Sequence, residues 1–531
     1  GVRLIPVPVG EAFPGSVEDG ALQWACAKDL HGLRNFFGEA RAPFESALVR
    51  QREEGQCHIH YRPTLEGFSA AQENAPVSEL FLSIDGLAFL AQREGRIGDS
   101  LDVVRTLLTR FETPLRVTLA ISGDESNRHF QSAAKKFFDQ SIHPIRYMSI
   151  PQANGDPWVQ DFLKAGHVGS EEKILVTRAA YEGQEALGAG LRPLLDSFAG
   201  PRFVRSRLSF EGGDLIIARD PREPQKRILF HGTSAKPYWG EALTMDEFAY
   251  VLRREFGTEK SIYLGDITPH ADYTISILGD RPVALVAQPV CGERELALGA
   301  VDVLMETYGE SIPELIRIQE LLTNNGEIGE LRSDKLLQAI ERAKSASVEW
   351  KAPVDAAVRA RIEGHVRENC PQRPMACIEG TSLAHLLDTQ RGLLLDWVEA
   401  GAQLRTGQVM ASRMLGAMEH QAQGCGAADG LQEVREKLKA VGFAVIPVPW
   451  IEPGKATSKH WPGVSYVNAA LVGGQLFLPS LGLGRIEEEW LQELQRQLPK
   501  GIEASYVPAR FSLMQNGGIH CLIAFGREGS W

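Results

Sequence analysis

The chain has 531 residues, which at about 150 residues per domain suggests roughly three or four structural units, and 44% of them are hydrophobic and 23% charged, as in ordinary globular proteins. Its 56 Lys and Arg residues against 68 Asp and Glu residues give a net charge of −12. This balance argues against a surface for nucleic acid or an anionic membrane, because both need a basic face. No segment has the ~20 apolar residues of a membrane helix, so we expect no nucleic-acid or membrane partner.

The seven cysteines are sparse and irregularly spaced, and none forms a CxxC pair. Their odd number leaves at least one thiol unpaired within the chain. This usage is typical of a reducing compartment or of thiols with individual roles. The first 17 residues contain no apolar core of a signal peptide. We therefore expect a cytoplasmic protein, and leave secretion open because the chain starts with Gly rather than Met.

Five stretches share one plan, in which a short apolar strand, an amphipathic helix and a second strand lead to a polar motif. In the first, the strand Arg116–Ile121 precedes helical spacing over 130–138 and a second strand at Ile145–Ile150. The other four begin near residues 174, 228, 431 and 486. Five such units predict an α/β fold closed as a pseudo-fivefold propeller, in which each unit offers its polar motif to a shared centre.

Two regions fall outside this repeat. Residues 294–430 have mostly helical spacing of apolar residues and predict a helical insertion. Residues 1–111 form a leading region with helical spacing from Leu101 to Phe111, and we assign it no function. The expected domains are an N-terminal extra domain at 1–111, units one to three at 112–293, the insertion at 294–430, and units four and five at 431–531.

The first candidate for chemistry is Gly517-Gly-Ile-His-Cys521. Its two glycines allow the backbone to turn sharply or to approach a ligand closely. An apolar strand is expected to begin at Cys521, which would place the thiol at a strand edge beside a turn. The pattern fits an accessible nucleophile, and it also fits a buried structural cysteine.

Two acidic motifs are candidates for binding a cation. Asp161, in Trp158-Val-Gln-Asp161, could pair with a guanidinium on which the indole stacks, although a helix cap or a surface carboxylate has the same pattern. Phe210-Glu-Gly-Gly-Asp214 supplies two further carboxylates, Glu211 and Asp214, but a simple acidic turn would read the same way.

The motif His270-Ala-Asp272 joins an imidazole and a carboxylate. Side chains two residues apart share a face in an extended segment, so both are expected to point the same way. A mononuclear metal site normally needs three or more protein ligands, and no neighbouring His motif supplies them. We therefore expect no metal and no cofactor, and interpret His270 as a general acid and base, because imidazole titrates near neutrality.

Two or three carboxylates, one His and one Cys at a shared centre suit nucleophilic attack on the carbon of a guanidinium cation. At this point the sequence resembles the guanidino-modifying, or pentein, superfamily, and within it the protein-arginine deiminases. The resemblance rests on Trp158-Val-Gln-Asp161, His270-Ala-Asp272 and Gly518-Ile-His-Cys521 in that order, and covers roughly 113–290 and 431–531. It implies a five-bladed α/β propeller.

Two further segments are similar to motifs of the superfamily. Tyr466-Val-Asn468, together with Leu476-Phe-Leu-Pro479, resembles the family's fourth repeat. Phe210-Glu-Gly-Gly-Asp214 is more similar to the motif of free-arginine deiminases, which implies that Glu211 and Asp214 contact substrate.

The resemblance implies a role for each matching residue. Asp161 and Asp272 would hold the guanidinium by charge-assisted hydrogen bonds, and Cys521 would attack its central carbon. His270 would protonate the departing ammonia and then activate water, which would give citrulline. Trp158 would stack on the aliphatic stem of the substrate.

The sequence departs from the calcium-dependent animal members, because Phe162 and Lys164 stand where those enzymes continue with acidic ligands. We therefore expect activity without calcium. For the arginine that holds the substrate's peptide backbone in the family, Arg178 is the candidate here.

The leading hypothesis is a deiminase acting on arginine in peptides or proteins. The same site would also suit free arginine, agmatine or amidino transfer to an amine, so a small guanidino compound is the alternative partner. A non-enzymatic binding module built on the propeller is the third hypothesis. Nothing in the sequence indicates an oligomeric state.

Overall fold

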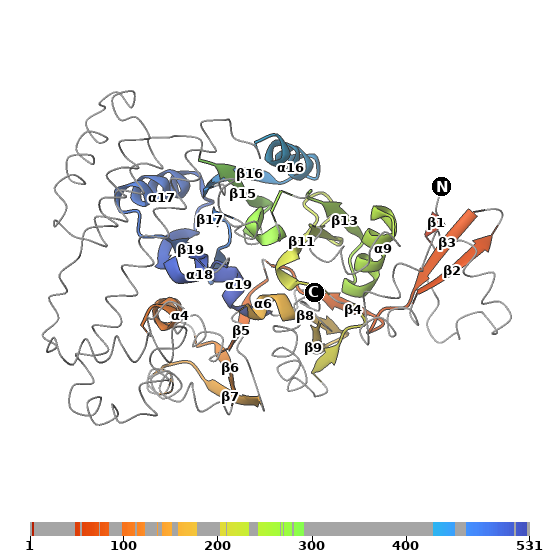
Figure 1. The fold of residues 1–531 in the computed structure, drawn as a ribbon, viewed down its shortest axis with the longest axis horizontal. Helices are drawn as coiled ribbons and strands as arrows, with labels where there is room; N and C mark the ends of the chain where they lie inside the picture. The colour runs from red at the N-terminus through yellow and green to blue at the C-terminus, as the bar shows by residue number, and fades with distance from the viewer. Residues whose placement is uncertain are drawn as a thin grey trace, which may run out of the picture.

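We describe the protein from a computed structural model (Figure 1). The structure describes residues 3–4, 48–53, 56–73, 75–83, 98–111, 114–122, 135, 138, 141–150, 158–177, 202–208, 210–232, 243–265, 267–268, 270–278, 281–290, 428–451, 463–514 and 517–527. Among the helices of these segments, none combines the length and the apolar character that crossing a bilayer requires. Arg178 and most of the predicted insertion at 294–430 lie outside the described residues.

The sheet formed by β11, β12 and β13 shows how one unit is built. Strand β11 (Leu215–Arg219) pairs antiparallel with β12 (Arg227–His231), and β12 pairs parallel with β13 (Lys260–Tyr263). The crossover between the two parallel strands contains helix α9 (Met245–Phe256), as the strand–helix–strand plan of the repeat predicts. A capping box at Thr244 and Glu247 starts this helix, and Gly257 in the left-handed conformation ends it.

Four other described sheets repeat this pairing, an antiparallel pair followed by a parallel one. Their strands are β8 (Leu163–Val168), β9 (Glu171–Val176) and β10 (Phe203–Arg205); β14 (Ile275–Leu278), β15 (Val283–Pro289) and β16 (Ala444–Ile451); β18 (Ala470–Val472), β19 (Gln475–Ser480) and β20 (Glu503–Pro508); and β21 (Ala524–Arg527), β5 (Val77–Ser83) and β6 (Arg116–Ser122). The α/β class is thereby confirmed, and the closed fivefold propeller stays a prediction.

Further strands and helices extend these sheets. Strands β4 (Phe68–Ala70), β7 (Ile145–Ile150) and β17 (Val464–Ser465) add to their edges, and β1 (Arg3–Leu4), β2 (Leu48–Glu53) and β3 (Gln56–Tyr61) form a separate sheet, drawn apart in Figure 1. Helices α16 (Ala428–Ala440) and α17 (Arg485–Gln497) precede β16 and β20, and α18 (Arg510–Met514) follows β20, so the helices predicted at 431–441 and 486–498 are confirmed.

The leading region is not separate from the repeated sheets. Strand β5 lies between β21, near the end of the chain, and β6, and helix α4 (Gly98–Arg110) forms the crossover from β5 to β6. Residues 77–110, which the sequence assigned to an N-terminal extra domain, therefore complete a sheet shared with the first and fifth units. The apolar side chains of α4 enter the main core, where Val104, Leu107 and Leu108 are buried.

The polar motifs lie just before the first strand of each antiparallel pair. Four of them form single turns: α6 (Val159–Phe162) before β8, the 3₁₀ turn η3 (Gly212–Asp214) before β11, the 3₁₀ turn η5 (Ala271–Tyr273) before β14, and α19 (Ile519–Leu522) before β21. The expectation that Cys521 starts a strand was wrong, because it lies inside α19 and β21 begins three residues later. The extended geometry expected for the His270 motif holds only for His270 itself.

The close approach of α9 to strand β4 gives a stability prediction. Gly257 (φ 63°) and Gly169 (φ 57°) both have left-handed backbones, but a Cβ at Gly257 would collide with the carbonyl of Phe68, whereas a Cβ at Gly169 would meet open space. Gly169→Ala should cost ~1–2 kcal/mol, from backbone strain alone. Gly257→Ala should cost ~1–3 kcal/mol more, because the neighbouring strand must shift. Urea unfolding of both variants would measure this, and equal losses would contradict the packing of α9 on β4.

Candidate active site

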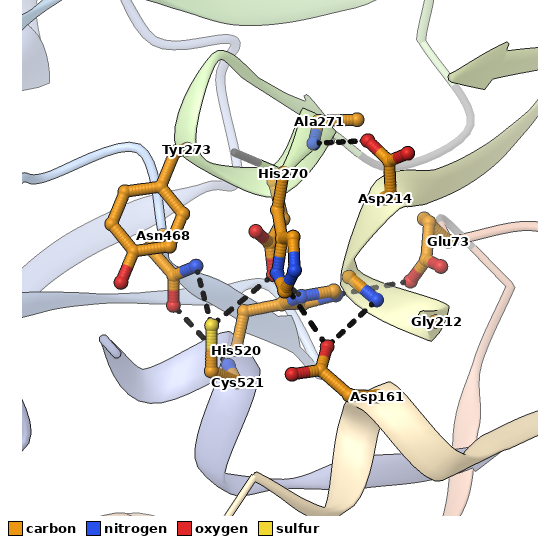
Figure 2. Close-up of polar contacts among 12 residues, drawn as sticks. Glu73, Asp161, Gly212, Asp214, His270, Ala271, Tyr273, Asn468, His520 and Cys521 are labelled. Carbon is orange, nitrogen blue, oxygen red and sulfur yellow. Dashed lines mark hydrogen bonds and ion pairs between the residues drawn. The ribbon is translucent and has the colours of Figure 1, made fainter. Parts of the chain in front are cut away.

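Cys521 lies at the centre of a buried polar cluster (Figure 2). Its side chain is 2% exposed. The sulfur lies 3.0 Å from Nδ2 of Asn468, which donates to it, and 3.4 Å from Oδ2 of Asp272, to which the thiol can donate. The backbone N–H of Cys521 donates to Oδ1 of Asn468 at 3.2 Å. The thiol is therefore held by defined polar contacts rather than by apolar packing alone.

The predicted residues of three different units converge beside Gly213. A Cβ at this glycine would lie 2.8 Å from Oδ1 of Asp161, 2.9 Å from Oδ2 of Asp272 and 3.0 Å from Nδ1 of His270. The Gly213 backbone N–H itself donates to Oδ1 of Asp161 at 3.1 Å. A side chain here would intrude on all three functional groups, which gives the Gly-Gly pair in the acidic motif a physical reason.

His270 lies between two carboxylates. Its Nε2 is hydrogen-bonded to Oε2 of Glu211, and its Nδ1 lies 3.6 Å from Oδ1 of Asp161. Burial alone would lower the pKa of this imidazole, but the two carboxylates and a hydrogen bond with Cys521 outweigh it and raise the pKa well above its usual value. His270 is therefore an imidazolium at neutral pH and can donate a proton.

The same surroundings hold Cys521 as a thiol. Burial raises its pKa most, the carboxylates of Asp272 and Asp161 raise it further, and His270 only partly offsets them. The neighbouring Tyr273 is also buried, and its pKa is raised well above the usual value by burial and by the charges of Cys521 and Asp272. Its phenol therefore stays protonated.

The carboxylates form a site for a cation. Asp161 and Glu211 lie beside the imidazolium of His270, and the third carboxylate, Asp272, is hydrogen-bonded to His520. Oδ1 of Asp272 is buried and has no hydrogen-bond donor among the described residues. A buried anionic oxygen without a donor is costly, so this atom favours a ligand that carries N–H groups and positive charge.

Asp214 accepts hydrogen bonds from backbone N–H groups, and its predicted contact with substrate stays a prediction. Its Oδ1 accepts from the N–H of Gly232 at 2.9 Å and of Ala271 at 3.1 Å. Because Ala271 lies between His270 and Asp272, this carboxylate holds the turn that presents them both. Asp214 therefore stabilises the turn that carries His270 and Asp272.

A second layer of charges lies behind the cluster, and the sequence analysis missed it. His520 Nδ1 bonds Oδ2 of Asp272 at 2.8 Å, and its Nε2 lies 3.5 Å from Oε2 of Glu73. Glu73 also binds Nζ of Lys164 at 2.8 Å and Nη2 of Arg527 at 3.0 Å. All five side chains are at most 9% exposed, so this is a buried ionic network.

The contacts of Lys164 show what this basic residue does in place of an acidic one. It occupies one of the two positions where calcium-dependent deiminases would carry an acidic ligand. Its ammonium contacts the carbonyl oxygens of Gly212 (3.3 Å) and Leu215 (2.5 Å) as well as Glu73. An internal cation therefore holds the acidic motif at this position.

The remaining predicted residues border the cluster. Trp158 is partly buried and immediately precedes the α6 turn that carries Asp161. A Cβ at Gly517 would overlap its indole ring, so the glycine allows the segment before Cys521 to pack against Trp158. His270, Asp272 and Cys521 have donor atoms within 4.8 Å of one another and are the group, among the described residues, that could hold a metal ion. The same spacing serves nucleophilic catalysis, and the expected absence of a metal stays a prediction.

Glu73 should be essential for stability. Glu73→Gln would leave Lys164 and Arg527 buried without their shared counter-charge, which typically costs ~3–5 kcal/mol. The control Glu433→Gln removes an exposed helical pair with Lys437 and should leave the free energy of unfolding nearly unchanged. Chemical denaturation at neutral pH would measure both.

The loss should also depend on pH. Lys164, Arg527 and His520 outweigh burial and hold the pKa of Glu73 well below its usual value, so its stabilisation is present at neutral pH and disappears as the pH falls through that lowered pKa. The pKa of His520 is raised to about 9 because Asp272 and Glu73 outweigh burial, so its contribution disappears as the pH rises through 9. A difference between wild type and Glu73→Gln that stayed constant down to strongly acidic pH would contradict this network.

Comparison with known proteins places the fold. No family model and no curated protein matches the sequence. A solved structure described as a "putative peptidyl-arginine deiminase" matches 88% of this chain and 100% of its own, at 10% identity and a TM-score of 0.50. The agmatine deiminase of C. jejuni matches 87% of this chain and 97% of its own (12% identity, TM-score 0.48), and that of Enterococcus faecalis 87% and 96% (12%, 0.43). At the level of the fold, the chain is thus similar to the deiminases of the guanidino-modifying superfamily that its motifs resemble.

Proposed function

We propose that this chain is a hydrolase that deiminates a guanidinium group through a covalent adduct with Cys521. The observation that carries the proposal is the convergence of a buried thiol, an imidazolium and three carboxylates at one point. These residues are Asp161, Glu211, His270, Asp272 and Cys521. They include all four residues that the sequence analysis predicted to be catalytic. The carboxylates and the imidazolium have the charges that deimination needs, and Cys521 would ionise when the substrate binds.

Substrate binding would use the carboxylates. The planar guanidinium would donate to Asp161 on one side and to Asp272 on the other, including the unpaired Oδ1 of Asp272. Its positive charge would neutralise the two carboxylates that, after burial, raise the pKa of Cys521 most. Binding would thereby favour the thiolate only when the reacting carbon is in place.

The chemical steps follow from the contacts. The Cys521 thiolate would attack the guanidinium carbon and form an S–C bond, and His270 would give its proton to the leaving nitrogen, which departs as ammonia. The neutral His270 would then accept a proton from water as that water attacks the adduct. As the C–S bond breaks, the departing sulfur takes the hydroxyl proton of the adduct, which leaves a neutral ureido group on the product and returns Cys521 to the thiol. This proton replaces the one that Cys521 released to solvent when it ionised on substrate binding.

For the substrate we propose arginine within a peptide or protein. The cations of the second layer, Lys164 and Arg527, are both bound to Glu73, and no other Lys or Arg of the described segments contacts the cluster. Among the described residues, the α-carboxylate of free arginine would therefore find no Lys or Arg at the cluster that is not already bound to Glu73, whereas peptidyl arginine has no such group. Agmatine, which also lacks a carboxylate, is the small-molecule alternative.

We also propose the fivefold propeller as the architecture of the site. Five sheets with one pairing pattern, and a first and last segment joined by β5 and β21, support it. In this arrangement the turns that precede the first strands would all face one axis.

The test of the function is Cys521→Ser. Serine preserves the shape but is not ionised near neutral pH, so turnover should fall by at least ~1,000-fold while the melting temperature stays close to that of the wild type. Ammonia and the ureido product, which is citrulline from arginine and carbamoylputrescine from agmatine, would be measured side by side for a blocked arginine peptide, agmatine and free arginine. Substantial turnover by the serine variant would remove Cys521 from its role.

The same panel tests the substrate. We expect kcat/KM to be highest for the blocked arginine peptide and lowest for free arginine. A preference for free arginine by orders of magnitude would overturn the peptide proposal and leave the chemistry in place. Formation of an amidinated amine instead of ammonia would show amidino transfer.

A further inference from the structure

The unit that begins at β18 has no assigned part in the chemistry, although the other four units each place a polar side chain at the centre. The corresponding position, two residues before the first strand of its antiparallel pair, is Asn468. Its side chain is fully buried and, as Figure 2 shows, it points at the sulfur of Cys521. Asn468 therefore completes the series of central residues.

The contacts of Asn468 determine how its amide group is oriented. Oδ1 accepts from the backbone N–H of Cys521 at 3.2 Å, so the oxygen must face the backbone. The amide nitrogen then faces the sulfur, at 3.0 Å, and can only donate to it. The O and N positions are thus distinguished by the hydrogen-bond pattern itself.

The backbone around Asn468 holds the nucleophile turn as well. The carbonyl oxygen of Asn468 accepts from the N–H groups of Ile519 (3.1 Å) and His520 (3.4 Å), the first residues of α19. A Cβ at Gly518 would lie only 2.6–2.8 Å from atoms of Asn468, so the glycine permits this approach. One residue thus binds the turn through its backbone and the reacting sulfur through its side chain.

The carboxylates around Cys521 explain why a neutral donor such as the Asn468 amide suits this position. Burial and two carboxylates oppose ionisation of Cys521, and a neutral N–H donor favours the thiolate without adding charge that would repel a cationic substrate. A hydrogen bond to an ionised group is stronger than one to its neutral form, so the contact to Asn468 strengthens as the thiol ionises. A Lys or Arg in this place would compete with the guanidinium for the carboxylates.

We propose that Asn468 is a catalytic residue that stabilises the Cys521 thiolate through its side-chain N–H and aims the sulfur at the substrate carbon. The assignment of a role in turnover rests on the proposed deimination, but the effect on the thiol does not. On ionisation the sulfur releases its proton to solvent, and Asn468 keeps both of its own amide protons throughout.

The test is the reactivity of the thiol in Asn468→Ala, measured on the full chain. Alkylation by iodoacetamide forms an S–C bond to Cys521 and releases iodide, and its rate follows the thiolate fraction. Mass spectrometry of the peptide that contains residue 521 reports this site alone among the seven cysteines. We expect the pKa of Cys521 to rise by about one unit or more, so that alkylation below this pKa becomes slower by a factor of about ten or more.

Two further variants make the result interpretable. Tyr466→Phe removes a buried hydrogen bond to Glu487 in the same segment and should leave the pKa of Cys521 unchanged. Asn468→Asp keeps an oxygen for the Cys521 N–H but presents a carboxylate to the sulfur. It should slow alkylation further, and it replaces the alanine variant if that one does not fold.

The outcomes separate this inference from the proposed function. If Asn468→Ala and wild type share one pH profile of alkylation, Asn468 is only structural and the inference fails, whatever the enzyme acts on. If the profile shifts while no guanidino compound is turned over by the wild type, the role at the thiol stands and the deiminase proposal fails. A shift of equal size in Tyr466→Phe would also overturn the inference, because it would show a general effect of the segment.

Discussion

The whole site depends on placing several carboxylates together where water cannot screen them. Asp161 and Glu211 lie beside His270, and Asp272 lies beside His520. The ionised forms of buried acids are costly unless cations and hydrogen bonds compensate them. The protein supplies part of this compensation through His270 and His520. The remainder is left to a ligand, and a buried, partly uncompensated negative site of this shape selects a planar cation with several N–H groups.

The repeated pairing of the sheets explains how residues so far apart in sequence reach this point. In each unit a single turn or short loop precedes the first strand of the antiparallel pair, and strands such as β11 and β15 behind it are mostly buried. The turns are thus held by the core, and hydrogen bonds such as those of Gly213 and Ala271 join neighbouring turns. Glycines at positions 213 and 518 allow neighbouring turns to approach within the reach of hydrogen bonds.

Much of the candidate site could be predicted from sequence, because each proposed catalytic residue lies in a short motif with a distinctive neighbour. The motifs of Asp161, His270 and Cys521 followed strands whose apolar pattern was clear, and the structure brings these three residues together. The local conformation was predicted less well. A single turn of helix, such as the one at Cys521, is too short to leave a periodic pattern of apolar residues.

The second layer could not be predicted for a different reason. Glu73, Lys164 and Arg527 look like surface charges in sequence, and only tertiary packing shows that they are buried together. Asn468 lies in a segment that resembles the fourth repeat of the superfamily. Its role could not be predicted from sequence, because an uncharged amide indicates no chemistry until its hydrogen-bond partner is known. The placement of Asp214 shows the converse, since an acidic residue in a promising motif holds backbone rather than facing the sulfur.

The central claim is that a bound cation converts a resting thiol into the nucleophile. It is tested most directly by titrating Cys521 with and without a saturating guanidinium or acetamidinium ion, following thiolate absorbance in the ultraviolet as the difference between wild type and Cys521→Ser. Because the cation neutralises Asp161 and Asp272, whose charges raise the pKa of the thiol, this account predicts that the pKa of Cys521 falls when the cation is bound. A pKa that stays the same or rises would contradict it.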